Sequence, residues 1–394
     1  MLLRPLGLIV AGCLIASVAR ADTGFVPMFD GKTLDGWEVV GGGAKYRVEN
    51  GEIVGEVDPT SRMNTFLRTK KSYGDFVLKV DLKLDLLANS GIQFRSHQRV
   101  EKSGIRVFGY QAEVDPSARA WSGGIYDEAR RGWIFDLKDR PEAQAAFKVD
   151  DWNSYTIEAI GPHLKVSVNG VPCADLLDAM DLEGFIALQV HVSNQPGTIR
   201  WRNVQIEDLG QSRWKSLWDG KTLDGWRTTG GGRWTVENGA IQGTQSSSES
   251  RHGHLVSDGE FGDFAFRLKF QSKKGNSGLY FRVEEGGTYG VRGFQAEIDP
   301  TADVGGIYET DGRGWVVQPA PADVKKWLKT EGWNELVVIA LGDRVLVQVN
   351  GNKSAEIVDP MGRRRGKFAL QLHGGQDVDV LFKDLEILPI SQGK

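Results

Sequence analysis

The most constraining feature of the sequence is that the chain spells nearly the same segments twice. NSGIQFR begins at Asn89 and returns as NSGLYFR at Asn276. Other pairs follow in the same order: FDGKTLDGW and WDGKTLDGW, YRVENGEIVG and WTVENGAIQG, GYQAEVDP and GFQAEIDP, GGIY twice, and ALQVH and ALQLH. The separation between partners drifts only from about 189 to about 181 residues. So long a period predicts two whole domains, because solenoids and propellers repeat every ~20–50 residues.

The seam between the two halves falls in the segment EDLGQSRW, around residues 209–213. We therefore expect a first domain over residues 24–209 and a second over residues 213–390. The chain of 394 residues is long enough for two domains with separate cores.

Each half has the turn chemistry of an all-β domain. Asn-Gly pairs sit between segments of alternating polarity, which is the strongest short signal for a β-hairpin. Short helical patches are expected only where PEAQAAFK begins at Pro141 and PADVKKWLK begins at Pro321. Many short strands separated by Gly and Asn favour an all-β fold of two tandem sandwiches or jelly rolls. The Asn-Gly pairs begin at Asn50, Asn169, Asn238 and Asn350.

The N-terminus has the pattern of a targeting signal. Arg4 precedes an apolar run over residues 6–18, and Ala19-Arg20-Ala21 matches a cleavage site, so residues 1–21 are predicted to be a signal peptide. A lipoprotein signal at Cys13 is the alternative. Both hypotheses predict an exported protein, periplasmic or extracellular.

Net charge, cysteine content and hydropathy exclude several classes of protein. A net charge of -4 gives no electrostatic basis for binding nucleic acid. Without Cys13, Cys173 is the remaining cysteine, so no intramolecular disulfide is expected. No later segment is long and apolar enough to suggest a transmembrane helix.

Strand alternation predicts which side chains share a face. In GIQFR the apolar Ile92 and Phe94 oppose Gln93 and Arg95, and QAEVD and ALQVH alternate in the same way. If these polar faces belong to one sheet, they form a groove able to bind a ligand or transfer protons. The alternative is an ordinary solvated face, because exposed faces of antiparallel sheets are polar anyway. The predicted groove residues are Arg95, Gln111, Glu113, Asp115, Gln189 and His191, repeated as Arg282, Gln295, Glu297, Asp299, Gln371 and His373.

The sequence lacks the motifs of several common enzyme classes. A retaining glucanase on a jelly roll can use E-x-D-x-x-E, but the place of the last Glu in this motif is taken by Ala118 in the first half and by Ala302 in the second. The chain has no G-x-S-x-G, H-E-x-x-H or P-loop pattern. Its 6 His residues are scattered, so a dedicated zinc site is not expected.

At this point the sequence resembles a known family. The segments DGKTLDGW, NSGIQFR, QAEVD, GGIY, WNSYTIEAIGPHLKVSVNG and ALQVH are similar to those of the bacterial 3-keto-disaccharide hydrolase family, over nearly all of both halves. The resemblance implies a concanavalin A-like jelly-roll sandwich. It also implies action on glycosides oxidised at C3, through elimination to a 3-keto-2-hydroxy-glucal and then hydration. An upstream sugar 3-dehydrogenase would supply the oxidised substrate. No cofactor is implied, and a divalent metal ion is left open.

The resemblance suggests roles for the groove residues. Glu113 or His191 would serve as base and acid, and Arg95 would stabilise the enolate oxygen; Glu297, His373 and Arg282 would do so in the second half. Trp121 and Trp133 are candidates for stacking on a sugar ring, with packing in the core as the alternative. The main alternative is a non-catalytic carbohydrate-binding or adhesion protein. The predicted substrate-binding residues are Asn89, Gln111, Asp115, Tyr126 and Gln189, with Asn276, Gln295, Asp299, Tyr308 and Gln371.

The two copies are not identical. RAWSGGIY in the first half is two residues longer than DVGGIY in the second, and Gln93 becomes Tyr280. We therefore expect either two working grooves with different substrates or one groove that only binds.

Overall fold

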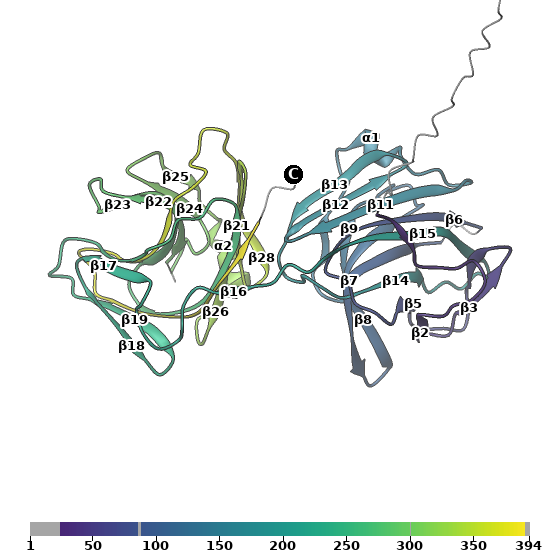
Figure 1. Ribbon diagram of the computed structural model, residues 1–394, viewed down its shortest axis with the longest axis horizontal. Coiled ribbons are helices and arrows are strands. Elements are labelled where there is room, and N and C mark those ends of the chain that lie inside the picture. Colours follow the sequence, from purple (N-terminus) through teal and green to yellow (C-terminus); the bar gives the residue numbers. More distant parts are fainter. Residues whose placement is uncertain (1–23, 86–87, 300, 391–394) are drawn as a thin grey trace, which may run out of the picture.

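The computed structural model describes residues 24–85, 88–299 and 301–390. Two β-sandwiches follow one another along the chain (Figure 1). The predicted all-β fold of tandem concanavalin A-like jelly-roll sandwiches is confirmed. The predicted signal peptide, residues 1–21, and the alternative lipid-attachment residue Cys13 lie outside the described residues. In the part of the chain that is described, no helix is both long and apolar enough to cross a membrane.

The first sandwich consists of two antiparallel sheets. Its eight-stranded sheet has the order β13-β12-β11-β6-β15-β4-β3, with β1 also pairing to β15. Its seven-stranded sheet has the order β10-β9-β8-β7-β14-β5-β2 and holds the QAEVD, NSGIQFR and ALQVH segments on three adjacent strands. The bounds are β1 Val26–Pro27, β2 Trp37–Gly41, β3 Lys45–Glu49, β4 Glu52–Glu56, β5 Thr65–Thr69, β6 Asp75–Leu84, β7 Ser90–Glu101, β8 Gly104–Val114, β9 Ile125–Glu128, β10 Gly132–Phe135, β11 Asn153–Ile160, β12 His163–Val168, β13 Val171–Leu177, β14 Phe185–Val190 and β15 Thr198–Gly210.

The second sandwich repeats this topology. Its eight-stranded sheet has the order β18-β19-β30-β21-β26-β27-β28, with β16 pairing to β30, and its seven-stranded sheet has the order β17-β20-β29-β22-β23-β24-β25. The bounds are β16 Lys215–Ser216, β17 Trp226–Gly230, β18 Arg233–Glu237, β19 Ala240–Gln245, β20 Gly253–Ser257, β21 Phe264–Lys274, β22 Ser277–Glu285, β23 Val291–Ile298, β24 Ile307–Thr310, β25 Gly314–Val317, β26 Asn334–Leu341, β27 Arg344–Val349, β28 Asn352–Val358, β29 Lys367–Leu372 and β30 Val378–Pro389.

A hydrophobic core lies between the two sheets of each sandwich, because alternate side chains of each strand face inward. In β6, Leu78, Val80 and Leu82 are buried while the residues between them are not. Trp201 on β15 is fully buried, and its ring stacks on that of Tyr46. These apolar faces hold the two sheets together and leave the opposite face of the seven-stranded sheet free for other groups.

The predicted hairpins and helices are present. In all four Asn-Gly turns both residues have positive φ, as a type I′ turn requires, and each turn joins two paired strands. The helices begin at the predicted prolines but are short: α1 spans Pro141–Gln144 and α2 spans Pro321–Trp327. The turns therefore fix the register of strands on which the rest of the fold depends.

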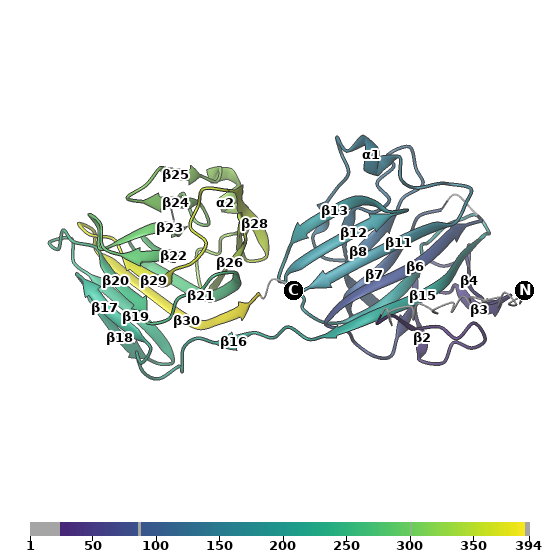
Figure 2. The same cartoon turned by 45° about the horizontal axis from the view of Figure 1, so that its top comes forward.

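A second apolar cluster joins the two sandwiches. Leu177 and Ala179, at the end of β13, pack on Val337, Ile339 and Leu346 of β26 and β27. Figure 2 shows β13 meeting the second sandwich at this junction. The outer face of the β26–β27 pair is therefore covered by the first sandwich.

Only the second sandwich has an apolar face at this place in the fold. The Asn-Gly turns align Val337, Ile339 and Leu346 of the second half with Thr156, Glu158 and Lys165 of the first. In the first half this face is polar, and Lys165 pairs with Glu158 at 3.7 Å. Divergence between the copies thus produced one apolar face, at the place where the first sandwich docks.

Candidate functional site

Each seven-stranded sheet carries a cavity on the face opposite the core. We call them the first cavity, of about 540 Å³, and the second cavity, of about 310 Å³. The first cavity is lined by Asn64, Asn89, Arg106, Gln111, Glu113, Asp115, Ser117, Arg119, Tyr126, Glu128, Trp133 and His191. The second is lined by His252, Asn276, Tyr280, Tyr289, Gln295, Glu297, Tyr308, Thr310, Trp315, Gln371 and His373.

A glutamate occupies the same position in both cavities. Glu113 on β8 pairs in register with Gly91 on β7, and Glu297 on β23 pairs with Gly278 on β22. The glycine explains part of the repeated NSG motif. A Cβ at Gly91 would lie 2.3 Å from the side chain of Gln111, and the corresponding contact of Gly278 is also 2.3 Å. The absence of a side chain lets the glutamine lie across the strand and reach the glutamate.

Two amides hold the Glu113 carboxylate. Asn89 Nδ2 donates to Oε1 at 2.5 Å and Gln111 Nε2 donates to Oε2 at 2.8 Å. Gln93 Nε2 in turn donates to Gln111 Oε1 at 2.7 Å, and Ser96 Oγ donates to Gln93 Oε1 at 2.6 Å. In this series of hydrogen bonds each donor points toward Glu113, so the carboxylate is oriented as the final acceptor.

The second cavity keeps the same clamp with a different support. Asn276 Nδ2 donates to Glu297 Oε1 at 2.6 Å, and Gln295 Nε2 donates to Oε2 at 2.9 Å. Gln371 Oε1 accepts from Gln295 at 3.1 Å, and its amide nitrogen donates to the hydroxyl of Tyr280. The clamp is common to both cavities, while the groups behind it have diverged.

Burial raises the pKa of both glutamates to near neutral pH. Loss of solvation is the largest effect and raises the pKa of Glu113 to about 7 and that of Glu297 to about 8. The amide donors act in the opposite direction but only in part, and nearby carboxylates (Asp115 and Glu128 in the first cavity) raise the pKa further. A carboxyl that gains and loses its proton near pH 7 is suited to general acid–base chemistry.

The two predicted histidines are also equivalent. Nδ1 of His191 lies 2.9 Å from the carbonyl of Val192, and Nδ1 of His373 lies 2.8 Å from that of Gly374. A carbonyl can only accept, so Nδ1 carries the proton and Nε2 is left to exchange one with a ligand. The histidines lie just beyond the ends of β14 and β29 and line the cavities.

A residue that sequence reasoning missed fixes the loop of each histidine. Asn64 Oδ1 accepts the backbone N–H of Val192 at 3.0 Å. In the second cavity His252, at the equivalent position before β20, accepts the N–H of Gly374 on Nδ1 at 3.1 Å. The ring of His252 lies 4.5 Å from that of His373, centroid to centroid. Burial lowers the pKa of His252 to about 4, so this ring is neutral.

The predicted placement of Arg95 and Arg282 in the groove is wrong. Arg95 has a φ of 45°, and the pairing of β7 with β8 shifts register between Phe94 and His97. Arg282 has a φ of 50° at a matching shift. These bulges interrupt the alternation on which the prediction rested and turn both side chains away from the cavity.

Both arginines tie loops to the end of the sheet instead. Arg95 donates to the carbonyls of Gly74 and Gly161 and pairs with Asp75 at 2.8 Å. Arg282 repeats these contacts, including a pair with Asp263 at 2.8 Å. Neither arginine lines the first or the second cavity, so neither is placed there to stabilise an enolate oxygen.

The other predicted residues divide into two groups. Tyr126, Tyr308 and Gln371 line their cavities, as do Trp133 and its equivalent Trp315. Gln189 does not line the first cavity; it is fully buried, and neither of its amide atoms has a partner within the described residues.

The aspartates and the second tryptophan differ between the copies. Asp115 lines the first cavity, whereas Asp299 is outside the second and binds Thr301 at the start of the following turn. Trp121 is not a lining residue; it packs edge-to-face on Trp133 at 4.8 Å.

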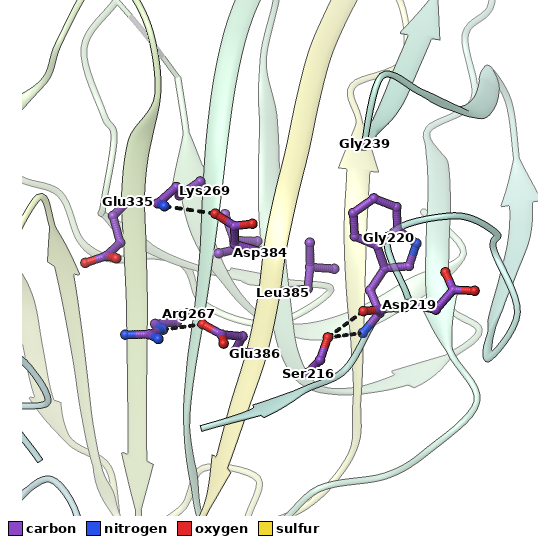
Figure 3. A pocket seen from close by; sticks show the side chains of 12 residues that line it. Ser216, Asp219, Gly220, Gly239, Arg267, Lys269, Glu335, Asp384, Leu385 and Glu386 are labelled. Atoms are coloured by element: carbon purple, nitrogen blue, oxygen red, sulfur yellow. Dashed lines mark hydrogen bonds and ion pairs between the residues drawn. The ribbon is translucent and has the colours of Figure 1, made fainter. Parts of the chain in front are cut away.

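A further cavity of about 520 Å³ lies on the outer face of the eight-stranded sheet in the second sandwich (Figure 3). Its basic groups are already paired: Arg267 with Glu386 at 2.6 Å and Lys269 with Asp384 at 2.8 Å. These pairs match a solvated sheet face. Among the described residues no cluster of three or more His, Cys, Asp or Glu is placed to hold a metal ion.

The fold and the paired cavities define a tandem β-sandwich protein with two related polar sites. Both halves match one family model, described as a 3-keto-alpha-glucoside-1,2-lyase-like domain, over residues 24–207 and 213–388. The chain therefore belongs to this family, in two copies, and the resemblance seen in the sequence is confirmed.

The similarity to individual proteins is low or covers only part of the chain. A 3-keto-disaccharide hydrolase of Bacteroides thetaiotaomicron is 36% identical over 84 residues, which span 18% of this chain and 27% of that protein. A crystal structure from Parabacteroides distasonis has 20% identity and a TM-score of 0.35, covering 45% of this chain and 94% of that one. The carbohydrate-binding module CBM66 of Bacillus subtilis has 20% identity and a TM-score of 0.33, covering 42% and 95%.

Proposed function

We propose that the protein cleaves glycosides whose sugar carries a ketone at C3, by elimination across C1 and C2 followed by addition of water. The observation that carries this proposal is the buried glutamate of each cavity, held by the same two amides and with its pKa raised to about 7 or 8. Membership in the 3-keto-alpha-glucoside-1,2-lyase-like family supports it.

In this proposal Glu113 and Glu297 are the bases. A ketone at C3 acidifies the hydrogen on C2, so one carboxylate is a strong enough base to remove it. The amide donors leave each carboxylate oxygen a free lone pair with which to accept that proton. A base placed in this way contributes typically ~10²–10⁴-fold to the rate.

The groups common to both cavities supply the remaining roles. His191 and His373 present Nε2, which in the protonated ring can donate to the departing oxygen on C1. Tyr126 and Tyr308 line the cavities and can donate a hydroxyl hydrogen bond to the enolate oxygen on C3. They take the role first expected of Arg95 and Arg282. Preorganised donors of this kind are worth a few kcal/mol each.

The steps balance without an external oxidant or reductant. The base takes the proton from C2, and that electron pair forms the enolate with the C3 oxygen. When the enolate collapses, a double bond forms between C1 and C2, the bond from C1 to the aglycone oxygen breaks, and the histidine protonates that oxygen. Water then adds its oxygen to C1 and a proton returns to C2, which gives the free 3-keto sugar.

Displacement at C1 is supported less well. That reaction needs two carboxyl groups across the scissile bond. The first cavity holds the carboxylates of Glu128 and Asp115 besides that of Glu113. In the second cavity the equivalent of Glu128 is Thr310, and Asp299, the equivalent of Asp115, does not line it. The equivalents of the third glucanase position are Ala118 and Ala302. A chemistry shared by both cavities therefore has to work with one glutamate.

The proposal includes the setting of the reaction. The N-terminal pattern supports export to the periplasm or the exterior, and the oxidised substrate requires an upstream dehydrogenase acting at C3 of the sugar. No cofactor takes part in the steps above. A protein that binds carbohydrate without cleaving it is the alternative that the test below separates.

The test is turnover of a 3-keto-glucoside in heavy water. The released 3-keto sugar should carry deuterium at C2, and an unoxidised glucoside should not be cleaved. A sample without protein measures spontaneous exchange at C2, and the Glu113→Gln, Glu297→Gln double variant measures residual activity. Retention of the original hydrogen at C2 during turnover, or equal cleavage of plain glucosides, would contradict the elimination; binding without any turnover would leave only the carbohydrate-binding alternative.

A further inference from the structure

The two cavities differ in charge at equivalent positions. Glu128, which pairs with Gly109, corresponds to Thr310, which pairs with Gly293. Three residues before each of these glycines, the first half has Arg106 and the second has Gly290. Arg119 lies in the loop that is two residues longer in the first half. The second cavity thus lacks both arginines.

Arg119 is held rigidly at the edge of the first cavity. Its Nε donates to Asp115 Oδ2 at 2.7 Å, and its guanidinium lies 4.7 Å from the ring centroid of Trp121 and 4.9 Å from that of Trp133. Its two terminal nitrogens have no hydrogen-bond partner in the described part of the chain, and 44% of the side chain is exposed. The rings fix the plane of the guanidinium while its fork stays open.

Arg106 is the second open guanidinium. Its closest carboxylate oxygen, on Glu128, is 3.8 Å away, which is beyond hydrogen-bond distance. Burial is the largest effect on the pKa of Tyr126 and raises it, whereas Arg106 and Arg119 are both near enough to lower it. Both arginines and the Tyr126 hydroxyl therefore act on one region of the first cavity.

The second cavity offers an anion nothing equivalent. No Arg or Lys lines it within the described residues. Its added side chains are rings: Tyr280, Tyr289 and His252. Carboxylates raise the pKa of the glutamate in both cavities, Asp115 and Glu128 in the first and Asp299 and Asp303 in the second, but only the first cavity has lining arginines to offset them.

We propose that the first cavity selects glycosides carrying a carboxylate beside the sugar, bound by Arg106 and Arg119, and that the second cavity selects neutral glycosides. A carboxylate matches the fork of a guanidinium, and charge-assisted hydrogen bonds are stronger than neutral ones. The tandem copies then divide acidic and neutral substrates between them. For turnover this inference rests on the proposed function, but the selection itself is a binding property and can be measured without chemistry.

The binding test compares phenyl glucoside with 4-carboxyphenyl glucoside, neither of them oxidised, by titration calorimetry on the full chain. The Arg106→Gln, Arg119→Gln variant should bind the acid about tenfold more weakly than the unaltered protein and bind the neutral glucoside equally well. Raised salt should weaken binding of the acid alone. Arg47→Gln, on the other sheet of the same sandwich, is the matched control and should change neither affinity.

The activity test uses the 3-keto forms of the same pair. Glu297→Gln leaves the first glutamate intact and Glu113→Gln leaves the second. The ratio of kcat/KM for the acidic substrate to kcat/KM for the neutral substrate should be about tenfold higher in Glu297→Gln than in Glu113→Gln. Adding Arg106→Gln and Arg119→Gln to Glu297→Gln should remove that difference, and Lys at both positions should restore part of it because the charge returns.

The outcomes separate the two proposals. A weaker binding of the acid in the Arg106→Gln, Arg119→Gln variant, without turnover of any 3-keto-glycoside, would support charge selection and reject the proposed function. Normal turnover with the same acid-to-neutral ratio in Glu297→Gln and Glu113→Gln would overturn charge selection and keep the function. Equal binding of both glucosides by the unaltered protein and by the Arg106→Gln, Arg119→Gln variant would also overturn it; circular dichroism must show that each variant is folded.

Discussion

Asn89 donates its side-chain amide to Glu113, and Asn276 donates to Glu297 in the same way, at 2.5 and 2.6 Å. The pair explains why the repeated motif begins with Asn. Removal from solvent disfavours the ionised glutamate, and the amide recovers part of that loss because it bonds to the charged form. The balance between these two effects sets the proton affinity of each cavity.

We expect each cavity to have its own pH dependence. The base must be ionised to take a proton, so kcat/KM on a 3-keto-glucoside should rise with pH through about 7 in Glu297→Gln, where Glu113 acts. In Glu113→Gln, where Glu297 acts, the rise should lie near 8. The measurement is the pH–rate profile of the two variants.

A further substitution tests the cause of these limbs. Asn89→Ala in the Glu297→Gln protein removes a donor that lowers the pKa of Glu113, so the rising limb should move to higher pH. An unchanged limb would mean that Glu113 is not the titrating base. Asn276→Ala in that protein is the control, because it touches the silenced cavity.

The same carboxyls should make folding stability depend on pH. The folded pKa is raised above the usual value of 4.5 in both, so the stability they contribute is fully present below about pH 4.5 and is lost as pH rises through about 7 and 8. The loss should be about 3 kcal/mol at Glu113 and about 5 kcal/mol at Glu297. Urea unfolding at pH 4.5 and pH 8.5 should show it.

The Glu113→Gln, Glu297→Gln double variant is the reference for this loss. Glutamine does not titrate, so the double variant should vary less with pH and should be more stable than the unaltered protein at pH 8.5. Equal slopes for the two proteins would show that neither glutamate has a raised pKa.

We expect Arg95 and Arg282 to matter for stability and not for the chemical step. Arg95→Leu leaves Asp75 buried without its ion pair and removes donors from two buried carbonyls. Breaking a buried pair from one side costs about 3–5 kcal/mol. The free energy of unfolding should fall by that amount, while kcat per folded molecule stays within a few fold.

Arg47→Leu gives the matched control for Arg95→Leu. Arg47 pairs with Glu49 on the surface at 2.9 Å, and exposed pairs are worth about 0–1 kcal/mol. A large fall in kcat for Arg95→Leu with unchanged stability would restore the original hypothesis that this arginine stabilises the enolate.

Sequence reasoning identified most of the cavity residues on the regular strands, although Gln189 on β14 is buried and does not line the first cavity. Period-2 alternation correctly brought Gln111 and Glu113 to one face, and the duplication carried the result to Gln295 and Glu297. It failed at Arg95, because a bulge adds a residue to one strand and reverses the faces that follow. The motif contains no Gly or Pro at the bulge to signal it.

The missed residues come from outside the repeated motifs. Asn64 and Arg106 lie on strands or loops whose neighbours in the sheet cannot be known from one sequence. The exchange of Asn64 for His252 hides their common task of holding the histidine loop. Only the three-dimensional pairing shows that two different side chains accept the same backbone N–H.

The junction between the sandwiches covers an apolar face of the second one. A protein restricted to residues 213–390 would expose Val337, Ile339 and Leu346, which are 6%, 0% and 1% exposed in the intact chain. Contiguous exposed apolar faces promote association. We expect this fragment to self-associate, whereas residues 24–210, whose equivalent β11–β12 face is polar, should remain monomeric.

The polar residues of the first half indicate which substitutions should prevent this self-association. Val337→Thr, Ile339→Glu and Leu346→Lys copy the residues at the equivalent positions, including the Glu158–Lys165 pair. The triple variant of the fragment should be monomeric by sedimentation and keep the native circular dichroism of a β-sandwich. In the intact chain the same three changes should weaken the junction instead, because charged groups would face Leu177 and Ala179. If the unaltered fragment is monomeric at the concentrations where the triple variant is, the apolar face does not drive association. The junction would then depend on its polar contacts, which include Gln348 with Asp178, Arg131 with Gly351 and Arg344 with Asp175.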